Sequence, residues 1–508
     1  MSAASDLLGV TQETFAMVKA ATAGIDTTTA VAGIDLLADL MSWVPVDVPF
    51  FTSTPRGQGK GATAAIYQAI INSNALQPDG GIARDTAAPV VDVANQWVYS
   101  HYASIGAGGK VTWDAIAQGL DYADVLAVDT LQAINQLLIS LEIHQLNAQS
   151  YALPAASAPT AVAATTGGSI AASTTVYVKV AARSGVNWYR GGSQAASAAS
   201  STTTASTGAT NSVVASVTAV KGAAGYDWYV GSASGSEFYY TTTPVNTVTV
   251  TSVPTAAQNV PTGYAGLYNA GGAGPTSVPA TDSSYQTFWQ NGLVASITGD
   301  FSGQPDQALV SGNQANLVTP GTGVSQGSYY ASLDGAQLSV SGAALEQIDT
   351  MNRAIYDTWQ ITPTRLLMGS QVITDVTNAV LDNPQAITFL EPNGENGRAR
   401  AQAGGHVATY LNKTVNGRPI KLCLMPYLPP GKVIAVSDEI PFPGANVTTP
   451  LQVRTQYDFF RFDYGANRES GVADGGPRYD FEVRSSQAFI NRASPMMGVI
   501  ENIGAGIA

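Results

Sequence analysis

The composition of the chain changes abruptly between Leu153 and Thr262, and this change limits the folds that are open to it. The stretch consists mainly of Ala, Ser, Thr, Gly and Val, with Tyr and Trp spaced along short segments typical of strands. It holds only four basic residues and two acidic ones, which are Lys179, Arg183, Arg190, Lys221, Asp227 and Glu237. A long helical pattern precedes it, and ordinary composition resumes after it. We therefore predict a small β-domain inserted into a loop of a larger domain.

Four segments of this stretch predict strands between Gly, Ser and Thr clusters: 176–180, 212–220, 226–230 and 247–250. A β-sandwich of about a hundred residues fits this pattern. The segment from Gly222 to Gly231 (GAAGYDWYVG) resembles the middle strand pair of fibronectin type III-like and immunoglobulin-like modules. The stretch contains no cysteine, so packing alone must hold such a module together.

The charge balance limits the partners of the chain. Charged residues make up 12% of 508 residues, about half the usual share, which suggests that much of the surface ends against other subunits. The net charge is −13, and no cluster of Lys and Arg is present, so we expect no nucleic-acid binding of its own. The single Cys423 indicates a reducing compartment. We see no secretory signal and no segment of transmembrane length.

The first part of the chain predicts a helix over 27–44, a glycine-rich hinge at Gly57–Gly61, and two extended arms over 62–100 that turn near Asp79. A long hairpin of this kind needs a surface to lie on. From Leu120 to Gln149 the pattern is helical, with an N-cap region at 112–114 before it. Thirty residues at about 1.5 Å rise give a rod of roughly 45 Å. The apolar face of this rod should carry Ala127, Leu131, Ile134, Leu138 and Leu141.

The later part mixes helices and strands. We expect a helix through Leu345 and Ile355, a strand at 365–368, and a second helix capped by Ser370. Segments 420–425 and 432–436 should pair across a turn at 429–431. In two long C-terminal strands, Phe460, Phe462 and Tyr464 alternate with Arg461 and Asp463, and Tyr479, Phe481 and Val483 alternate with Asp480, Glu482 and Arg484. Each should have one wet face.

Catalytic patterns are weak in this sequence. Ser325 lies in a GxSxG pattern (323–327), and Asp375 and His406 follow in the order of an α/β-hydrolase. The surrounding loop residues do not supply the strand and helix that this elbow requires. His101, His144 and His406 are scattered, without metal-ligand spacing, and Gly57–Gly61 lacks the ending of a phosphate loop. We expect no enzyme, no cofactor and no metal.

The order of elements outside the inserted stretch resembles the major capsid proteins of tailed bacteriophages, whose fold is named after phage HK-ninety-seven. The residues that carry the resemblance are 345–369, a helix that runs into WQITPTRLLMG, together with 417–420 (GRPI) and 479–492. The likeness covers residues 30–153 and 264–503 as an order of elements. Its implied class is α+β, with an all-β sandwich inserted.

The resemblance implies a division of the chain into named parts. These are an N-terminal arm (1–50), an E-loop hairpin (51–108), a peripheral domain with a long spine helix (109–153 and 264–364), the inserted immunoglobulin-like sandwich (155–262), an axial domain (365–440) and C-terminal strands that return to the peripheral domain (441–508). Assembly contacts are expected at Arg56, Lys60, Arg84 and Trp97. Some relatives link subunits through a Lys–Asn bond; Lys60 and Asn467 match no motif for it.

On this interpretation the chain assembles with itself as hexamers and pentamers of an icosahedral shell in the virion, formed in the host cytoplasm. It would enclose double-stranded DNA without specific binding, with the sandwich displayed outside. Scaffold, portal and decoration proteins are further candidate partners, and no membrane is involved. Two alternatives stay open: another virion structural protein, such as a tail-tube or fibre subunit, and a serine hydrolase built on Ser325.

Overall fold

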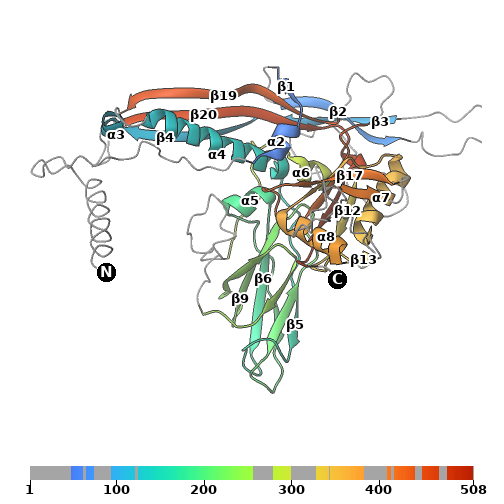
Figure 1. Cartoon of the computed structure of the whole chain (residues 1–508). Helices are drawn as coiled ribbons and strands as arrows, with labels where there is room; N and C mark the ends of the chain where they lie inside the picture. Colours follow the sequence, from blue (N-terminus) through green and yellow to red (C-terminus); the bar gives the residue numbers. More distant parts are fainter. Residues whose placement is uncertain are drawn as a thin grey trace, which may run out of the picture.

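A computed structural model describes residues 47–60, 64–73, 93–119, 124–255, 278–298, 328–341, 344–382, 409–412, 417–440, 449–467 and 478–506. Its largest feature is a long sheet in the order β1-β19-β20-β4, along one side of which helix α4 runs (Figure 1). Its strands are β1 (Arg56–Gln58), β4 (Ala103–Thr112), β19 (Leu451–Asn467) and β20 (Arg478–Asn491). The two long C-terminal strands predicted from the sequence are thus present, paired antiparallel. The mixed α+β class is confirmed.

Helix α4 (Val125–Asn147) is shorter than the predicted rod. Its 23 residues span about 35 Å. Asp124 ends it on the N-terminal side, because its side chain accepts hydrogen bonds from the amides of Leu126 and Ala127, each at 3.1 Å. A separate short helix, α3 (Trp113–Gly119), precedes it, and the Thr112 hydroxyl accepts from the Ala115 amide at 3.3 Å.

The buried face of α4 agrees with the predicted one at Ile134, Leu138 and Leu141 and differs from it elsewhere. Leu131 is 50% exposed and Ala127 is exposed, whereas Ala133, Leu137 and Leu141 are buried against the long sheet. The C-terminal half, 139–147, is covered on several sides, by α2 (Pro49–Ser53), α5 (Gly185–Arg190), α6 (Leu293–Thr298) and β20. The period of the apolar residues predicted the helix correctly but could not indicate from which side each neighbour would cover it.

A two-stranded hairpin projects from the end of the long sheet (Figure 1). Its strands, β2 (Ala64–Ser73) and β3 (Val93–His101), pair antiparallel, as the two predicted arms require. The turn expected near Asp79, like the helix expected over 27–44, lies outside the described residues. Only the root of the hairpin has a core in the described chain: Ala65 and Tyr67 pack on Ala488 and Ile490 of β20.

The second sheet has six strands in the order β12-β21-β18-β15-β17-β16. They are β12 (Tyr329–Ser332), β15 (Arg365–Met368), β16 (Thr409–Asn412), β17 (Arg418–Leu424), β18 (Val433–Val436) and β21 (Gly498–Glu501). The predicted pairing of 420–425 with 432–436 is wrong. Strand β15 lies between them, parallel to β17 and antiparallel to β18, and its buried apolar residues 366–368 are typical of a central strand that is covered on both faces.

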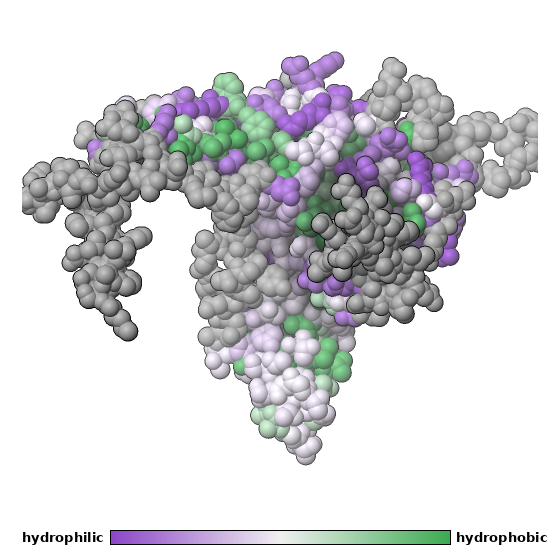
Figure 2. Space-filling model, viewed as in Figure 1, coloured by the Kyte–Doolittle hydropathy of each residue, from purple (hydrophilic) through white to green (hydrophobic). Residues whose placement is uncertain are grey.

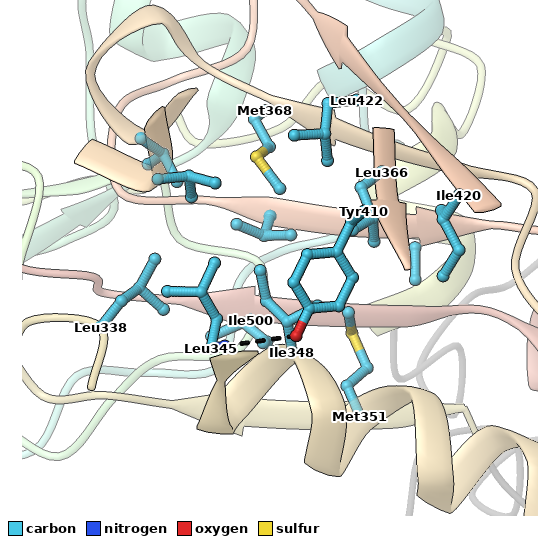
Figure 3. Close-up of a cluster of buried hydrophobic side chains, with 14 of the residues drawn as sticks. Leu338, Leu345, Ile348, Met351, Leu366, Met368, Tyr410, Ile420, Leu422 and Ile500 are labelled. Carbon is cyan, nitrogen blue, oxygen red and sulfur yellow. Dashed lines mark hydrogen bonds between the residues drawn. The ribbon is translucent and has the colours of Figure 1, made fainter. Parts of the chain in front are cut away.

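Helices α7 (Glu346–Trp359) and α8 (Ser370–Asp382) accompany this sheet. Leu345, Ile348 and Met351 meet Leu366 and Ile420 in a cluster that Figure 3 shows, and the Tyr410 hydroxyl accepts from the Leu345 amide at 3.2 Å. Ser370, predicted as a cap, is the first residue of α8. The short pieces β13 (Val340–Ser341), β14 (Ala344–Leu345) and η4 (Ser494–Met496) complete this part.

The inserted stretch forms two sheets that point away from the long sheet, on the side of α4 (Figure 1). One has the order β10-β9-β6-β7 and the other β11-β8-β5. Their strands are β5 (Thr160–Ala164), β6 (Thr175–Arg183), β7 (Ser200–Thr203), β8 (Ser212–Ser216), β9 (Gly225–Gly231), β10 (Phe238–Thr243) and β11 (Thr247–Val250). Val178, Trp228, Val213 and Val250 belong to one buried cluster between the sheets. All four predicted strands are present.

Candidate assembly interface

The long sheet has an outer face, defined here as the side turned away from α4. On the α4 side, Phe481 and Val483 of β20 are buried against the helix. The alternation of a strand then places Asp480, Glu482 and Arg484 on the outer face. This wet face of β20 agrees with the sequence prediction.

Strand β19 does not orient its side chains as its sequence pattern predicts. Its register against β20 shifts at 455–457 and again at 457–460, and Phe459 has a φ of 48°. This bulge changes which residues face the helix. Arg461 therefore lies on the α4 side, with its guanidinium 4.8 Å from the Phe481 ring centroid; the predicted wet face of β19 is wrong at Arg461, whereas Asp463 is exposed as predicted.

The shift leaves an aromatic row, Phe460, Phe462 and Tyr464, on the outer face. Phe460 is 54% exposed and Tyr464 is 51% exposed. The rings of Phe460 and Phe462 lie 4.7 Å apart, and the Tyr464 hydroxyl donates to Glu482 at 2.8 Å. Arg484 donates to the same carboxylate and lies 5.5 Å from the Phe462 ring. These contacts fix the side chains but leave the row uncovered.

The root of the hairpin lies on the same outer face, at its other end. Ala488 and Ile490, which Ala65 and Tyr67 cover, have the same parity on β20 as Glu482 and therefore share its face. The hairpin thus covers one end of this face and leaves the aromatic row open. Ile66, on the other side of strand β2, is 52% exposed.

Of the four predicted contact residues, two have described side chains. Arg56 forms an ion pair with Asp458 and stacks 3.8 Å from the Phe51 ring, so its own chain occupies it. Lys60 is exposed. Trp97 pairs with Gln68 in the β2–β3 ladder, but its side chain, like all of Arg84, lies outside the described residues.

The glycine-rich hinge expected at Gly57–Gly61 is held in place over its described part. Arg56, Gly57 and Gln58 pair in parallel with β19, and the Gly59 amide donates to the Thr455 carbonyl at 2.7 Å. A Cβ on Gly59 would meet the Tyr102 hydroxyl at 2.5 Å. Close approach, rather than free rotation, is the reason for glycine here.

The chain enters this region through α2, which a buried carboxylate of α4 anchors. Glu142, fully buried, accepts hydrogen bonds from the amides of Phe50 at 3.1 Å and Phe51 at 2.6 Å. Burial raises the pKa of Glu142 to about 7, the two amides oppose that rise, and the charge of Asp47 adds to it. Two residues along the helix, burial lowers the pKa of His144 to about 4, and Arg190 contributes to the shift.

A polar joint connects the inserted stretch to the body. Glu501 of β21 accepts from the Lys432 ammonium at 2.6 Å and from the Gly222 amide at 3.2 Å, and the side chains of both charged residues are buried. Asn246 donates to Asp334 at 2.8 Å. Gly222 and Asn246 belong to the insert, whereas the other three residues belong to the body.

The described residues offer little for catalysis. Asp375 accepts from Gln371 and from the Gly506 amide, each at 3.0 Å, while Ser325 and His406 lie outside the described residues. Within the described part, no group of three His, Cys, Asp or Glu side chains could hold a metal ion. None of its helices is both long enough and apolar enough to cross a membrane.

Comparison with known proteins gives likeness in structure only. No protein-family model matches the sequence, and no curated protein is similar to it. The solved structures it resembles include the capsid of an empty GTA particle, at 8% identity and a TM-score of 0.40, covering 95% of this chain and 100% of that one. The capsid of Myoviridae phage XM1 has 7% identity and a TM-score of 0.39 over 94% and 100%. The cyanophage A-1(L) capsid asymmetric unit has 10% identity and a TM-score of 0.43 over 92% and 96%.

Proposed function

We propose that the chain is a major capsid protein that assembles with copies of itself into the icosahedral shell of a tailed phage or phage-like particle. The observation that carries this proposal is that the chain has both a projecting hairpin and an uncovered aromatic face. The described side chains of the hairpin β2–β3 form a core at its root, and two strands alone are marginally stable in water. The outer face keeps large rings exposed. Each feature is incomplete in one copy and would be completed by another.

The geometry favours a repeated contact between copies. The root of the hairpin and the aromatic row lie at opposite ends of the same face of the long sheet, so one copy cannot bring its own hairpin onto its own row. A contact between different patches generates rings or shells when repeated. The proposed role is structural, in the virion, and the enclosed DNA would need no specific binding.

The inserted stretch would then be a displayed immunoglobulin-like module. It points away from the outer face, and its surface is pale in Figure 2, close to neutral hydropathy, whereas strongly hydrophilic residues gather over the body. Val162 and Val214, neighbours on β5 and β8, are 59% and 42% exposed, and no charged residue is adjacent to them in the sheet. Scaffold, portal and decoration proteins remain proposed partners on the basis of the resemblance alone.

Deletion of residues 62–100 tests the proposal. Because the described core contacts of the hairpin with the body lie at its root, the shortened chain should stay soluble and folded yet form no closed particles under electron microscopy. Intact shells from this deletion would contradict the proposal. Tubes from the full chain would favour the tail-tube alternative, and labelling of Ser325 by a serine-directed probe would favour a hydrolase.

The receiving face has its own test. Phe460→Ser with Tyr464→Ser removes two half-exposed rings, so the melting temperature of the free chain should change little while particle yield falls at least about tenfold. Val162→Ser with Val214→Ser is the matched control, because it changes similarly exposed apolar residues on the insert. Equal particle yields from both pairs would count against the outer face as the contact.

A further inference from the structure

Two arginines lie beside the root of the hairpin, and the described residues give neither of them a partner. Arg454 of β19 is opposite Ala488 in the ladder, and Arg492 directly follows β20, its amide bound to the Pro450 carbonyl at 3.0 Å. Among the described residues, neither guanidinium has an ion pair, a side-chain hydrogen bond or an aromatic stacking contact. By contrast, Arg56, Arg461 and Arg484 on the same sheet are each paired with a carboxylate.

Arg454 and Arg492 lie at the same end of the long sheet, because Arg454 is opposite Ala488 and the ladder continues to Arg492, whose amide donates to the Pro450 carbonyl. Arg454 is opposite Ala488 in the ladder, so its side chain lies on the outer face as well. The side chains of Arg454 and Arg492 are half-buried. The pKa of Arg492 is lowered by burial first and then by the positive charge of Arg454. The positive charge of Arg492 favours a lower pKa of the buried Tyr67 hydroxyl, against the effect of burial. The charge of Arg454 does the same for the Tyr102 hydroxyl. The free chain therefore holds two like charges together at the point where the hairpin leaves the body, an arrangement that an anion placed between them would stabilise.

We propose that Arg454 and Arg492 together bind a carboxylate presented by a second copy of the chain. The proposal rests on the proposed function, since it assumes that copies lie against the hairpin root. A carboxylate accepts two parallel hydrogen bonds from a guanidinium, which gives such a contact both strength and direction. The chain has 36 acidic residues against 23 basic ones, so a neighbouring copy presents carboxylates in excess.

The surroundings favour a carboxylate over a nucleic-acid phosphate. The same outer face carries Glu482 and Asp480, and Asp458 lies in the bulge of β19. These negative charges would repel a DNA backbone, which needs an extended basic surface rather than one pair of cations.

The test compares full-length variants in assembly. Arg454→Gln with Arg492→Gln should raise the concentration of free subunits in equilibrium with particles about tenfold at low salt, corresponding to about 1.4 kcal/mol per contact. The variant should also lose part of the dependence of assembly on NaCl concentration. The melting temperature of its free subunit should stay equal or rise, because a repulsion between like charges is removed. Replacement of both arginines by Lys should restore assembly only in part, because an ammonium keeps the charge but cannot form the two parallel hydrogen bonds.

The control is Arg353→Gln, an exposed arginine of α7 with no ion pair among the described residues, which should leave the free-subunit concentration unchanged. An unchanged subunit concentration and salt dependence in the Gln pair would overturn the inference. Loss of binding to a short DNA duplex, with assembly intact, would equally overturn it. If the wild-type chain itself forms no particles, the proposed function fails instead, and the two failures are thereby distinguished.

Discussion

At the scale of single residues, Glu142 and His144 have opposite effects on stability as the pH changes. Because burial raises the pKa of Glu142 from 4.5 to about 7, the stability it contributes is complete below pH 4.5 and is lost as the pH rises to 7. His144 has its pKa lowered from 6.5 to about 4, so its contribution is complete above pH 6.5 and is lost as the pH falls to 4. Between these limits the two effects offset each other.

Glu142→Gln should remove the pH dependence of stability that comes from Glu142 and leave the one that comes from His144. The free energy of unfolding of the wild type minus that of the variant should fall by about 3 kcal/mol between pH 4.5 and 7, because a shift of one pKa unit corresponds to about 1.4 kcal/mol. Chemical denaturation at several pH values measures this difference. A difference that stays constant across that range would mean that Glu142 does not titrate there.

At the scale of elements, the fit of α4 against β4 depends on one glycine. A Cβ on Gly109 would overlap both Asp129 of α4 and the ring of Phe481, whereas a Cβ on Gly108, on the opposite face of the strand, would meet only the Phe481 carbonyl at 3.4 Å. Gly109→Ala should therefore lower the free energy of unfolding by about 1–3 kcal/mol. Gly108→Ala should leave it unchanged or slightly higher, since alanine suits a strand better than glycine. Urea denaturation of the two variants compares them, and equal losses would contradict this account.

Elements whose residues meet close neighbours in sequence could be predicted well. The spacing of Leu345, Ile348 and Met351 predicted α7, and the apolar run 365–368 coincides with β15. The inversion of β19 could not be predicted, because it depends on a bulge at Phe459 whose cause is the pairing with β20. Strand order in the six-stranded sheet failed for the same reason, since a tight turn between two segments does not specify that they pair.

The candidate site, too, could be predicted from the sequence only in part. The two arms of the hairpin were visible as strands, and their need for a partner followed from their lack of core. Arg454 and Arg492 were not singled out, because they are far apart in the chain and only the register of β19 against β20 brings them together. A search for unpaired cations near the ends of predicted strands is the signal that could have found them.

At the scale of the whole molecule, the buried pair Lys432–Glu501 of the body lies at the joint, where Glu501 also accepts a hydrogen bond from the Gly222 amide of the insert. Glu501→Gln would leave the Lys432 ammonium buried without its carboxylate, so the free energy of unfolding should fall by about 3–5 kcal/mol. Replacing both residues, Lys432→Met with Glu501→Leu, should recover much of that loss, because no buried charge is left unpaired. Thermal denaturation of the three chains is the measurement. A double variant as unstable as the single one would show that packing, and not charge, holds the joint.

The same joint has a consequence for any particle built from this chain. Because Glu501 accepts a hydrogen bond from Gly222, and Asp334 accepts one from Asn246, the insert is attached to the body at two separate places, which restricts its rotation. Every copy would present the module at one tilt, so the spacing and orientation of the modules would be dictated by the lattice beneath them. Averaged density would then be as sharp over the projecting modules as over the shell itself.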